Sequence, residues 1–175
     1  SKDDPDFASW PAGRTKQPGC YENARVQGKN QTLEAGTYYI DGDLEFDNGS
    51  EVSGDGVTFV LLNGEVEFGN GSKQDLSAPK EKTSNDANLN YQGIVMFALG
   101  RGQIEWNSGS KTNLNGALYF PESDFTVSGG SKVSNQCQQL VAEDVTFESG
   151  SQWQTNCDDV SVRRISAGSR VVLVQ

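Results

Sequence analysis

The chain has 175 residues, with 20 glycines, no histidine and a net charge of −10 from 14 Lys and Arg against 24 Asp and Glu. The lack of histidine excludes Ser-His-Asp catalysis, Cys-His catalysis and histidine-ligated metal sites, and the negative charge argues against nucleic-acid binding. The longest apolar runs, at 56–62 and 93–99, are too short to span a bilayer, so we expect no membrane insertion within this sequence.

The first 35 residues show no internal repeat. They contain Trp10, scattered charges and the three prolines Pro5, Pro11 and Pro18. Repeat structures need a terminal segment that covers the end of their core. We therefore predict that residues 1–35 form an irregular lead-in that caps one end of the fold.

From residue 36 onward the sequence is repetitive. Gly-Ser pairs recur at 49–50, 71–72, 109–110, 130–131, 150–151 and 168–169. Five of them follow a tetrapeptide in which polar and apolar residues alternate, at 43–46, 65–68, 103–106, 124–127 and 144–147. This alternation indicates a strand with one buried face, and the glycine that follows suits a turn with positive φ.

A second class of apolar segment fills the rest of each unit, at 36–40, 57–62, 94–99, 117–120, 140–142 and 160–162. A polar insertion at 73–92 explains the one long spacing between Gly-Ser pairs. The pattern predicts an all-β fold over 36–175, a β-solenoid that is most simply a parallel β-helix of about six coils. A sandwich of hairpins is the alternative, although hairpins do not require one tetrapeptide to recur at equivalent places.

Equivalent residues of successive coils stack in a parallel β-helix. The last residues of the five tetrapeptides are then expected to form an inward column of core side chains: Phe46, Phe68, Trp106, Val127 and Phe147. We interpret this column as aromatic core packing rather than a cofactor site.

Two of the three cysteines occupy equivalent positions. Cys137 and Cys157 each come six residues after the serine of a Gly-Ser pair. In adjacent coils their Cα atoms lie about 5 Å apart, within the range of a disulfide. We predict a Cys137–Cys157 bridge, which implies an oxidising compartment; two buried free thiols are the alternative. Cys20 is left free or in a pairing that the sequence does not define.

The outward positions of the tetrapeptides are rich in carboxylates. Stacking places two neighbouring rows on one face, and their acidic members are Asp43, Glu45, Glu65, Glu67, Glu105, Asp124 and Asp144. Like charges about 5 Å apart repel one another. The simplest interpretation is a solvated acidic face that keeps the domain soluble. The functional alternative is binding of Ca²⁺ or of a basic partner, although the EF-hand spacing is absent.

The second class of segment is apolar on both faces, as if covered on both. We expect residues 1–35 or the inserted loop to cover the outer face at 57–62, 94–99 and 117–120. The alternative is an exposed apolar patch that docks against another part of a longer protein or an assembly partner.

Several strings along 33–160 resemble the C-terminal region of TadG-like proteins of bacterial tight-adherence (Flp-type) pilus systems. They are Leu-Glu-Ala-Gly-Thr-Tyr-Tyr at 33–39, Asp-Leu-Glu-Phe at 43–46, Leu-Ser-Ala-Pro at 76–79, Leu-Asn-Gly-Ala-Leu-Tyr-Phe-Pro at 114–121 and the Leu-Val-Ala after Cys137. The resemblance implies a pilus-associated envelope protein with a membrane anchor before this segment, and it transfers no catalytic residues.

These observations lead to the expectation of a non-catalytic structural and adhesive module outside the cytoplasm, in the periplasm, at the cell surface or on a pilus. We expect its partners to be pilus or envelope proteins, or host or abiotic surfaces, and we expect no cofactor. A glycan-binding or ice-binding module is the alternative in another class. A polysaccharide-acting β-helix enzyme is less favoured, since no groove combining acids with Arg or Lys is evident.

Overall fold

A computed structural model describes residues 7–84, 90–135 and 138–155 of the chain. These residues contain strands and no helix, so none of them forms a helix able to cross a bilayer. The strands are β1 (Ala8–Ser9), β2 (Thr15–Lys16), β3 (Gly19–Val26), β4 (Gln31–Leu33), β5 (Gly36–Phe46), β6 (Glu51–Asp55), β7 (Val57–Asn63), β8 (Val66–Phe68), β9 (Lys73–Ser77), β10 (Ile94–Ala98), β11 (Gln103–Trp106), β12 (Lys111–Val127), β13 (Lys132–Asn135), β14 (Gln138–Phe147) and β15 (Gln152–Thr155).

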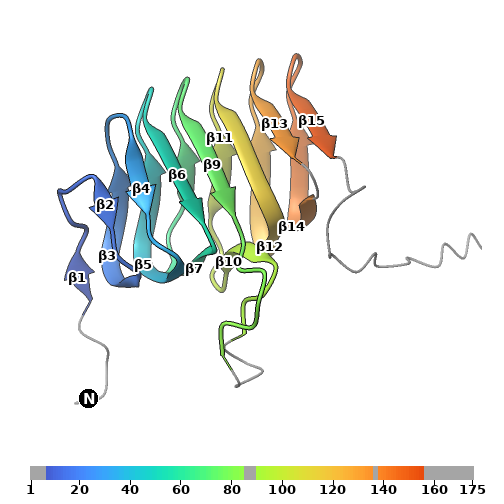
Figure 1. Cartoon of the computed structure of the whole chain (residues 1–175). Helices are drawn as coiled ribbons and strands as arrows, with labels where there is room; N and C mark the ends of the chain where they lie inside the picture. The colour runs from blue at the N-terminus through green and yellow to red at the C-terminus, as the bar shows by residue number, and fades with distance from the viewer. Residues whose placement is uncertain (1–6, 85–89, 136–137, 156–175) are drawn as a thin grey trace, which may run out of the picture.

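The chain winds as a parallel β-solenoid of about six turns, which confirms the predicted fold class (Figure 1). Each coil contributes to two facing layers. Sheet A contains β1, β3, β5, β7, β8, β10, β11, β14 and the second half of β12, whereas sheet B contains β2, β4, β6, β9, β13, β15 and the first half of β12. The registered pairs in both sheets are parallel, so each residue stands beside its equivalent in the next coil.

The predicted inward column forms the centre of the core. Phe46, Phe68, Trp106 and Val127 are each at most 1% exposed. The rings of Phe46 and Phe68 stack with centroids 4.7 Å apart, and those of Phe68 and Trp106 with centroids 3.9 Å apart. Phe147 continues the column but is 49% exposed, because it lies on β14, the last strand of sheet A among the described residues.

A short polar chain crosses this core. The indole nitrogen of Trp106 donates to Thr112 Oγ1 at 2.8 Å, and the Thr112 hydroxyl donates to Gln74 Oε1 at 3.1 Å. All three residues are buried. The bonds satisfy the indole N–H, which would otherwise be costly to bury, and they connect sheet A to sheet B across two coils.

The regular coils begin earlier than the sequence pattern predicted. Within the segment expected to be irregular, β3 pairs with β5 and β4 pairs with β6 in the solenoid register. The turn between them uses Gly28 at φ 75° and Asn30 at φ 58°, both in the left-handed region that Gly and Asn adopt most readily. This coil was missed because its turn has no Gly-Ser pair.

The segment before that coil closes the end of the core. The Trp10 ring packs edge-on against Tyr21 with centroids 4.9 Å apart, and it also contacts the Tyr38 ring. The Lys16 side chain is buried, and its Nζ donates to the carbonyls of Pro11 and Gly13. Burial lowers the pKa of Lys16. The N-terminal end of the solenoid is thus sealed by the chain's own residues.

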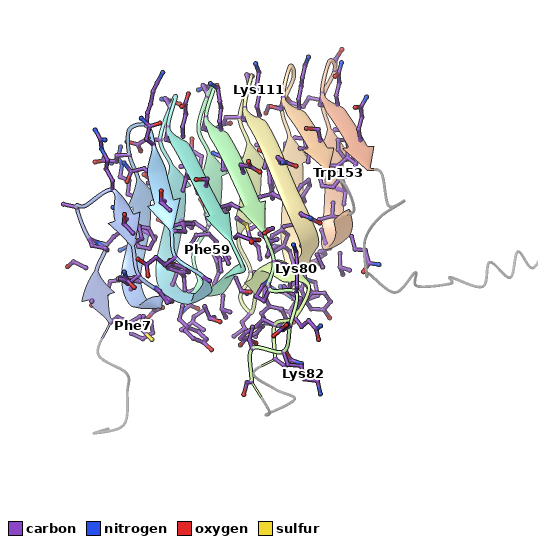
Figure 2. The ribbon with its side chains drawn as sticks, viewed as in Figure 1. Phe7, Phe59, Lys80, Lys82, Lys111 and Trp153 are labelled. Atoms are coloured by element: carbon purple, nitrogen blue, oxygen red, sulfur yellow. The ribbon has the colours of Figure 1, made fainter. Side chains whose placement is uncertain are left out.

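The insertion is also shorter than predicted, because residues 73–77 form the regular strand β9 between β6 and β12. The extra residues therefore lie between Ser77 and Ile94, and their described parts, 78–84 and 90–93, project from one edge of the coils (Figures 1 and 2). Their return places Tyr91 on the outer face of sheet A, where its ring contacts those of Tyr39 and Phe97.

Candidate functional surfaces

The acidic face lies on sheet A, where β5, β8, β11, β12 and β14 run side by side. The register sets Glu45 beside Glu67 and Glu67 beside Glu105. Thr126 and Thr146 continue this row. In the neighbouring row Gln103 lies beside Asp124, and Asp124 beside Asp144. The structure therefore brings the predicted acidic residues of these rows onto one outward surface.

The carboxylates at the N-terminal end of this face have a cationic partner. Arg25 stands in register with Glu45, and its Nε lies 3.3 Å from Glu45 Oε2 and 2.8 Å from Asp47 Oδ1. The hydrogen bond to Asp47 raises the pKa of Arg25 further. Because Arg25 belongs to the coil that the sequence pattern missed, its contribution to the acidic face was not foreseen.

Farther along, the carboxylates are held by neutral groups. Asn107 Nδ2 donates to Glu67 Oε1 at 2.6 Å. The backbone N–H of Glu65 donates to Asp43 Oδ1 at 3.0 Å. Both bonds join neighbouring coils, so they hold the carboxylates along the solenoid axis and leave their charge in contact with solvent.

The spacing of the acidic side chains decides whether this face has the geometry of a Ca²⁺ site. Neighbouring members of a row are separated by one strand spacing, about 4.8 Å, and extend outward in parallel rather than converging. In the part of the chain that the structure describes, no group of three or more Asp, Glu, Cys or His residues is arranged to hold a metal ion. A Ca²⁺ ion at this face would meet carboxylates in a line, whereas Ca²⁺ sites enclose the ion with six to eight oxygens.

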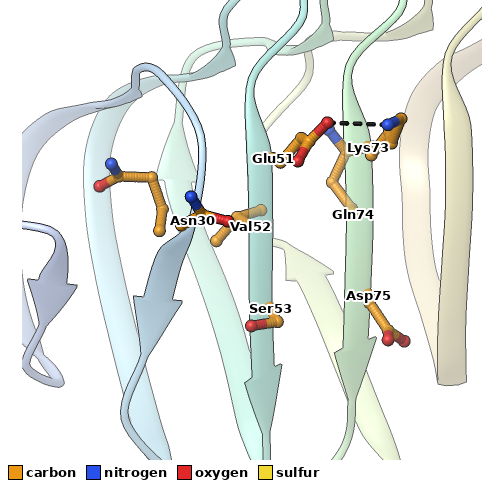
Figure 3. A pocket seen from close by; sticks show the side chains of 8 residues that line it. Asn30, Glu51, Val52, Ser53, Lys73, Gln74 and Asp75 are labelled. Carbon is orange, nitrogen blue, oxygen red and sulfur yellow. Dashed lines mark hydrogen bonds and ion pairs between the residues drawn. The ribbon is translucent and has the colours of Figure 1, made fainter.

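A second polar surface, on sheet B, was not among the sequence predictions. A shallow hollow of about 250 Å³ lies over β6 and β9 (Figure 3), and it is lined by Asn30, Gln31, Glu51, Val52, Ser53, Lys73, Gln74 and Asp75. Lys73 Nζ donates to Glu51 Oε1 at 2.7 Å, and Lys29 Nζ lies 3.8 Å from the same oxygen. The hydrogen bond from Lys73 lowers the pKa of Glu51.

Hydrogen-bonding side chains continue beyond the hollow in both directions of the solenoid. Thr32 stands beside Ser53, Ser53 beside Asp75, and Asp75 beside Asn113, whose Nδ2 donates to Asp75 Oδ1 at 2.7 Å. A lysine row runs next to them, since Lys73 pairs with Lys111 and Lys111 with Lys132. The signal in the sequence is the residue after each of the first five Gly-Ser pairs, which is Glu51, Lys73, Lys111, Lys132 and then Gln152.

An apolar row occupies the outer face of sheet A beside the insertion. The register aligns Tyr39, Val60, Phe97, Tyr119 and Val141. As expected, the insertion covers part of this row, because Val60 is 1% exposed and lies between the two residues that Tyr91 contacts. Burial raises the pKa of Tyr91 to about 12. Tyr119 and Val141, farther along, stay 39% and 41% exposed.

The orientation of these rings limits what they bind. Phe97 and Tyr119 stack on one another with centroids 5.3 Å apart and planes inclined by 7°. Their faces are thus used along the solenoid, and their edges are directed outward. Aromatic rings that hold a sugar by stacking need a free face, so this row does not form a sugar-stacking platform.

The predicted disulfide falls outside the described residues, because both Cys137 and Cys157 do. Cys20 is described, and it is a half-buried free thiol in register with Tyr39. Searches of protein-family models, of curated proteins and of solved structures found no match to this chain.

Proposed function

We propose that the chain is a non-catalytic structural and adhesive module that presents two chemically different faces to partners outside the cytoplasm. The observation that carries the proposal is the register of the two sheets. The register places equivalent residues of successive coils side by side, so the outward side chains form rows. On sheet A these include acidic rows, and on sheet B they contain lysines and other hydrogen-bonding side chains. Such extended, rigid surfaces suit the binding of a large partner better than catalysis on a small molecule.

The disposition of the carboxylates supports a non-catalytic role. Polysaccharide hydrolysis uses two carboxylates that face one another across a bound sugar. The acidic residues on sheet A instead stand side by side on one outward surface. The resemblance to TadG-like proteins supports the further proposal that the partner belongs to a tight-adherence pilus or to the surface that the pilus contacts.

The test is an in-frame deletion of residues 33–175 in the native host, with surface pili counted by electron microscopy and cell attachment measured in parallel. An adhesive module predicts normal pili and lost attachment. Loss of the pili would favour an assembly role for the same protein, and normal pili with normal attachment would contradict the proposal.

Surface variants then distinguish the two faces. Lys73→Glu with Lys111→Glu and Lys132→Glu alters sheet B, and Glu45→Gln with Glu67→Gln and Glu105→Gln alters sheet A. All six residues are at least partly exposed, so we expect both triple variants to fold. The variant that lowers attachment identifies the adhesive face. Attachment at the level of the parent chain in both triple variants would exclude these rows.

Glycan binding is the second candidate, and the sheet B hollow favours it. Its lining offers amides, a hydroxyl, carboxylates and a lysine in one shallow surface, which are the groups that bind sugar hydroxyls. A glycan array probed with the 175-residue chain tests this function directly. Binding that is lost in Lys73→Glu and retained in Glu67→Gln would support it, and an array without signal would exclude it for the glycans printed.

A further inference from the structure

Sheet B carries a cationic patch on an otherwise acidic chain. Lys111 on β12 and Lys132 on β13 stand in register, and both are exposed. The sheet B parts of these strands, 111–115 and 132–135, contain no Asp or Glu. Among the described residues, neither lysine has a carboxylate within ion-pair distance. Like charges on neighbouring strands repel one another, so the patch has a cost that no described residue of the chain offsets.

The acidic row on sheet A is uncompensated in the same way. Glu67 lies beside Glu105, and in the part of the chain that the structure describes neither has a cationic partner. The bond that Glu67 accepts from Asn107 comes from a neutral amide. Each face therefore holds a row of one sign of charge, and the two signs are opposite.

The two rows follow the same edge of the solenoid. In one coil Glu67 and Lys73 lie on either side of a turn, and in the next coil Glu105 and Lys111 do. These turns line one edge of the coils, whereas the described parts of the insertion project from the opposite edge (Figures 1 and 2). Because the sheets face one another across the core, a copy displaced sideways can lay its sheet B on the sheet A of its neighbour, with the lysine row over the acidic row.

We propose that copies of this chain associate side by side, with the lysine row of one copy on the acidic row of the next. Both rows follow the parallel register, so both have the spacing of one strand, about 4.8 Å. A shift of one coil along the axis sets Lys111 against Glu67 and Lys132 against Glu105. Equal spacing lets both pairs form at once. The inference rests on the proposed function, since it names a partner for the two faces.

The contact uses different surfaces of the two copies, so each bound copy still presents a free acidic row on one side and a free lysine row on the other. Such contacts generate open assemblies unless the rotation between copies closes a ring. Repulsion between copies of net charge −10 is largely screened beyond about 8 Å at physiological salt. We therefore expect weak, concentration-dependent assembly into a series of oligomers.

Sedimentation velocity of the 175-residue chain in about 0.15 M NaCl tests the proposal. The sedimentation coefficient should rise as the concentration increases toward about 1 mM, the range of weak surface contacts. Lys111→Glu with Lys132→Glu, and Glu67→Lys with Glu105→Lys, each set like charges against one another across the contact. We expect either double variant to weaken association about tenfold or more. A parent chain that stays monomeric throughout would overturn the proposal and favour an anionic partner of another kind for the lysine row.

Mixing the two double variants separates the contact from other effects of the substitutions. Each variant alone sets like charges together, but the reversed acidic row of one meets the reversed lysine row of the other with opposite charge. An equimolar mixture should therefore associate as the parent chain does, which misfolded variants would not do. A mixture that stays monomeric would overturn the proposal, and so would parent-like association of either variant alone.

Lys80→Glu with Lys82→Glu is the matched control for net charge. It makes the same change of charge as the double lysine variant on sheet B, but at exposed residues of the insertion, at the opposite edge of the coils (Figure 2). Association of this control should equal that of the parent chain. An equal loss in both lysine variants would show that net charge governs assembly, and it would overturn the proposal.

The result is separable from that of the attachment test. A monomeric chain whose deletion from the host still abolishes attachment overturns self-association alone. A self-associating chain whose deletion leaves pili and attachment normal contradicts the adhesive function alone.

Discussion

Glu51 and Lys73 show how the solenoid register creates local electrostatics. The two residues are 22 positions apart in sequence, yet they are direct neighbours on β6 and β9 and share a 2.7 Å hydrogen bond. That bond is the main cause of the lowered pKa of Glu51, with Lys73 and Lys29 adding attraction. The pair marks one wall of the sheet B hollow.

Replacing Lys73 by Gln should raise the pKa of Glu51 toward its ordinary value of 4.5. A carboxylate whose pKa is lower in the folded chain stabilises the fold above the pKa of the unfolded chain, and that contribution is lost as the pH falls through the folded value. The stabilising contribution of Glu51 should therefore decline below about pH 4.5 in the parent chain, and above that pH it should be smaller in Lys73→Gln than in the parent. The effect is modest because both side chains are partly exposed.

Titration of the Glu51 carboxyl carbon by NMR measures this shift directly. Lys132→Gln is the matched control, since Lys132 lies in the same lysine row but pairs with Lys111 and Gln152 rather than with a carboxylate. An unchanged Glu51 titration in Lys73→Gln would show that the hydrogen bond does not form in solution.

At the scale of single elements, two glycines at turns show how neighbouring coils are held at a constant spacing. Gly71 has φ 66°, and a Cβ there would meet no atom within 4 Å. Gly64 has φ 87°, and a Cβ there would lie 2.2 Å from the carbonyl oxygen of Gly42 in the preceding coil. Both positions need positive φ, but only Gly64 also needs the close approach of two backbones.

The two glycines should therefore respond differently to alanine. Gly71→Ala is expected to lower the free energy of unfolding by roughly 1–2 kcal/mol, the cost of a left-handed alanine. Gly64→Ala adds a backbone clash that neighbouring coils cannot relieve, so about 2–5 kcal/mol is expected. Urea denaturation of both variants measures the difference, and equal losses would show that the coils separate easily at Gly64.

The insertion is a loop whose contacts also depend on its position in the fold. Its length and polarity are visible in the sequence, and so is the need for something to cover the second class of apolar segment. Which side chain does so depends on where the loop returns to the coils. Tyr91 stands just before β10, and this position brings it onto the apolar row at Phe97 and Tyr39.

At the scale of the whole molecule, the parallel register converts a net charge of −10 into ordered rows. Glu67 lies between Glu45 and Glu105 on neighbouring strands, and of these three only Glu45 has a cationic partner in the part of the chain that the structure describes. Like charges directly opposite one another destabilise a sheet. The acidic face is thus maintained against its own repulsion, as expected for a surface that serves binding or solubility rather than stability.

Removing the central charge should stabilise the chain. Glu67→Gln keeps an oxygen that accepts the bond from Asn107. Relief of two like-charge contacts of about 0.2–1 kcal/mol each should raise Tm by about 1–8 °C at low salt. The gain should shrink in 0.5 M NaCl, because salt screens exposed charges. Thermal melts at both salt concentrations provide the measurement.

Glu81→Gln is the control for that experiment. It removes the same unit of charge from the insertion, away from the rows, and should leave Tm nearly unchanged. A similar Tm rise in both variants would mean that net charge, rather than the row on sheet A, sets the stability of the chain.

The sequence alone determined the period, the strand class and the central core. A tetrapeptide that recurs at equivalent places predicts stacking in parallel coils, and stacking then places Phe46, Phe68 and Trp106 in one column. The acidic rows on sheet A follow from the same step, because alternate residues of a strand face opposite sides. These are properties of regular repetition, and a regular pattern is visible without coordinates.

Only the tertiary structure decided the features that depart from the repeat. The first coil, in β3 and β4, replaces the Gly-Ser turn with one built on Gly28 and Asn30, so pairing with β5 and β6 was needed to reveal it. The sheet B hollow depends on which side chains become neighbours across 22 residues of sequence. In each case the decisive contact lies between coils, where sequence distance carries little information.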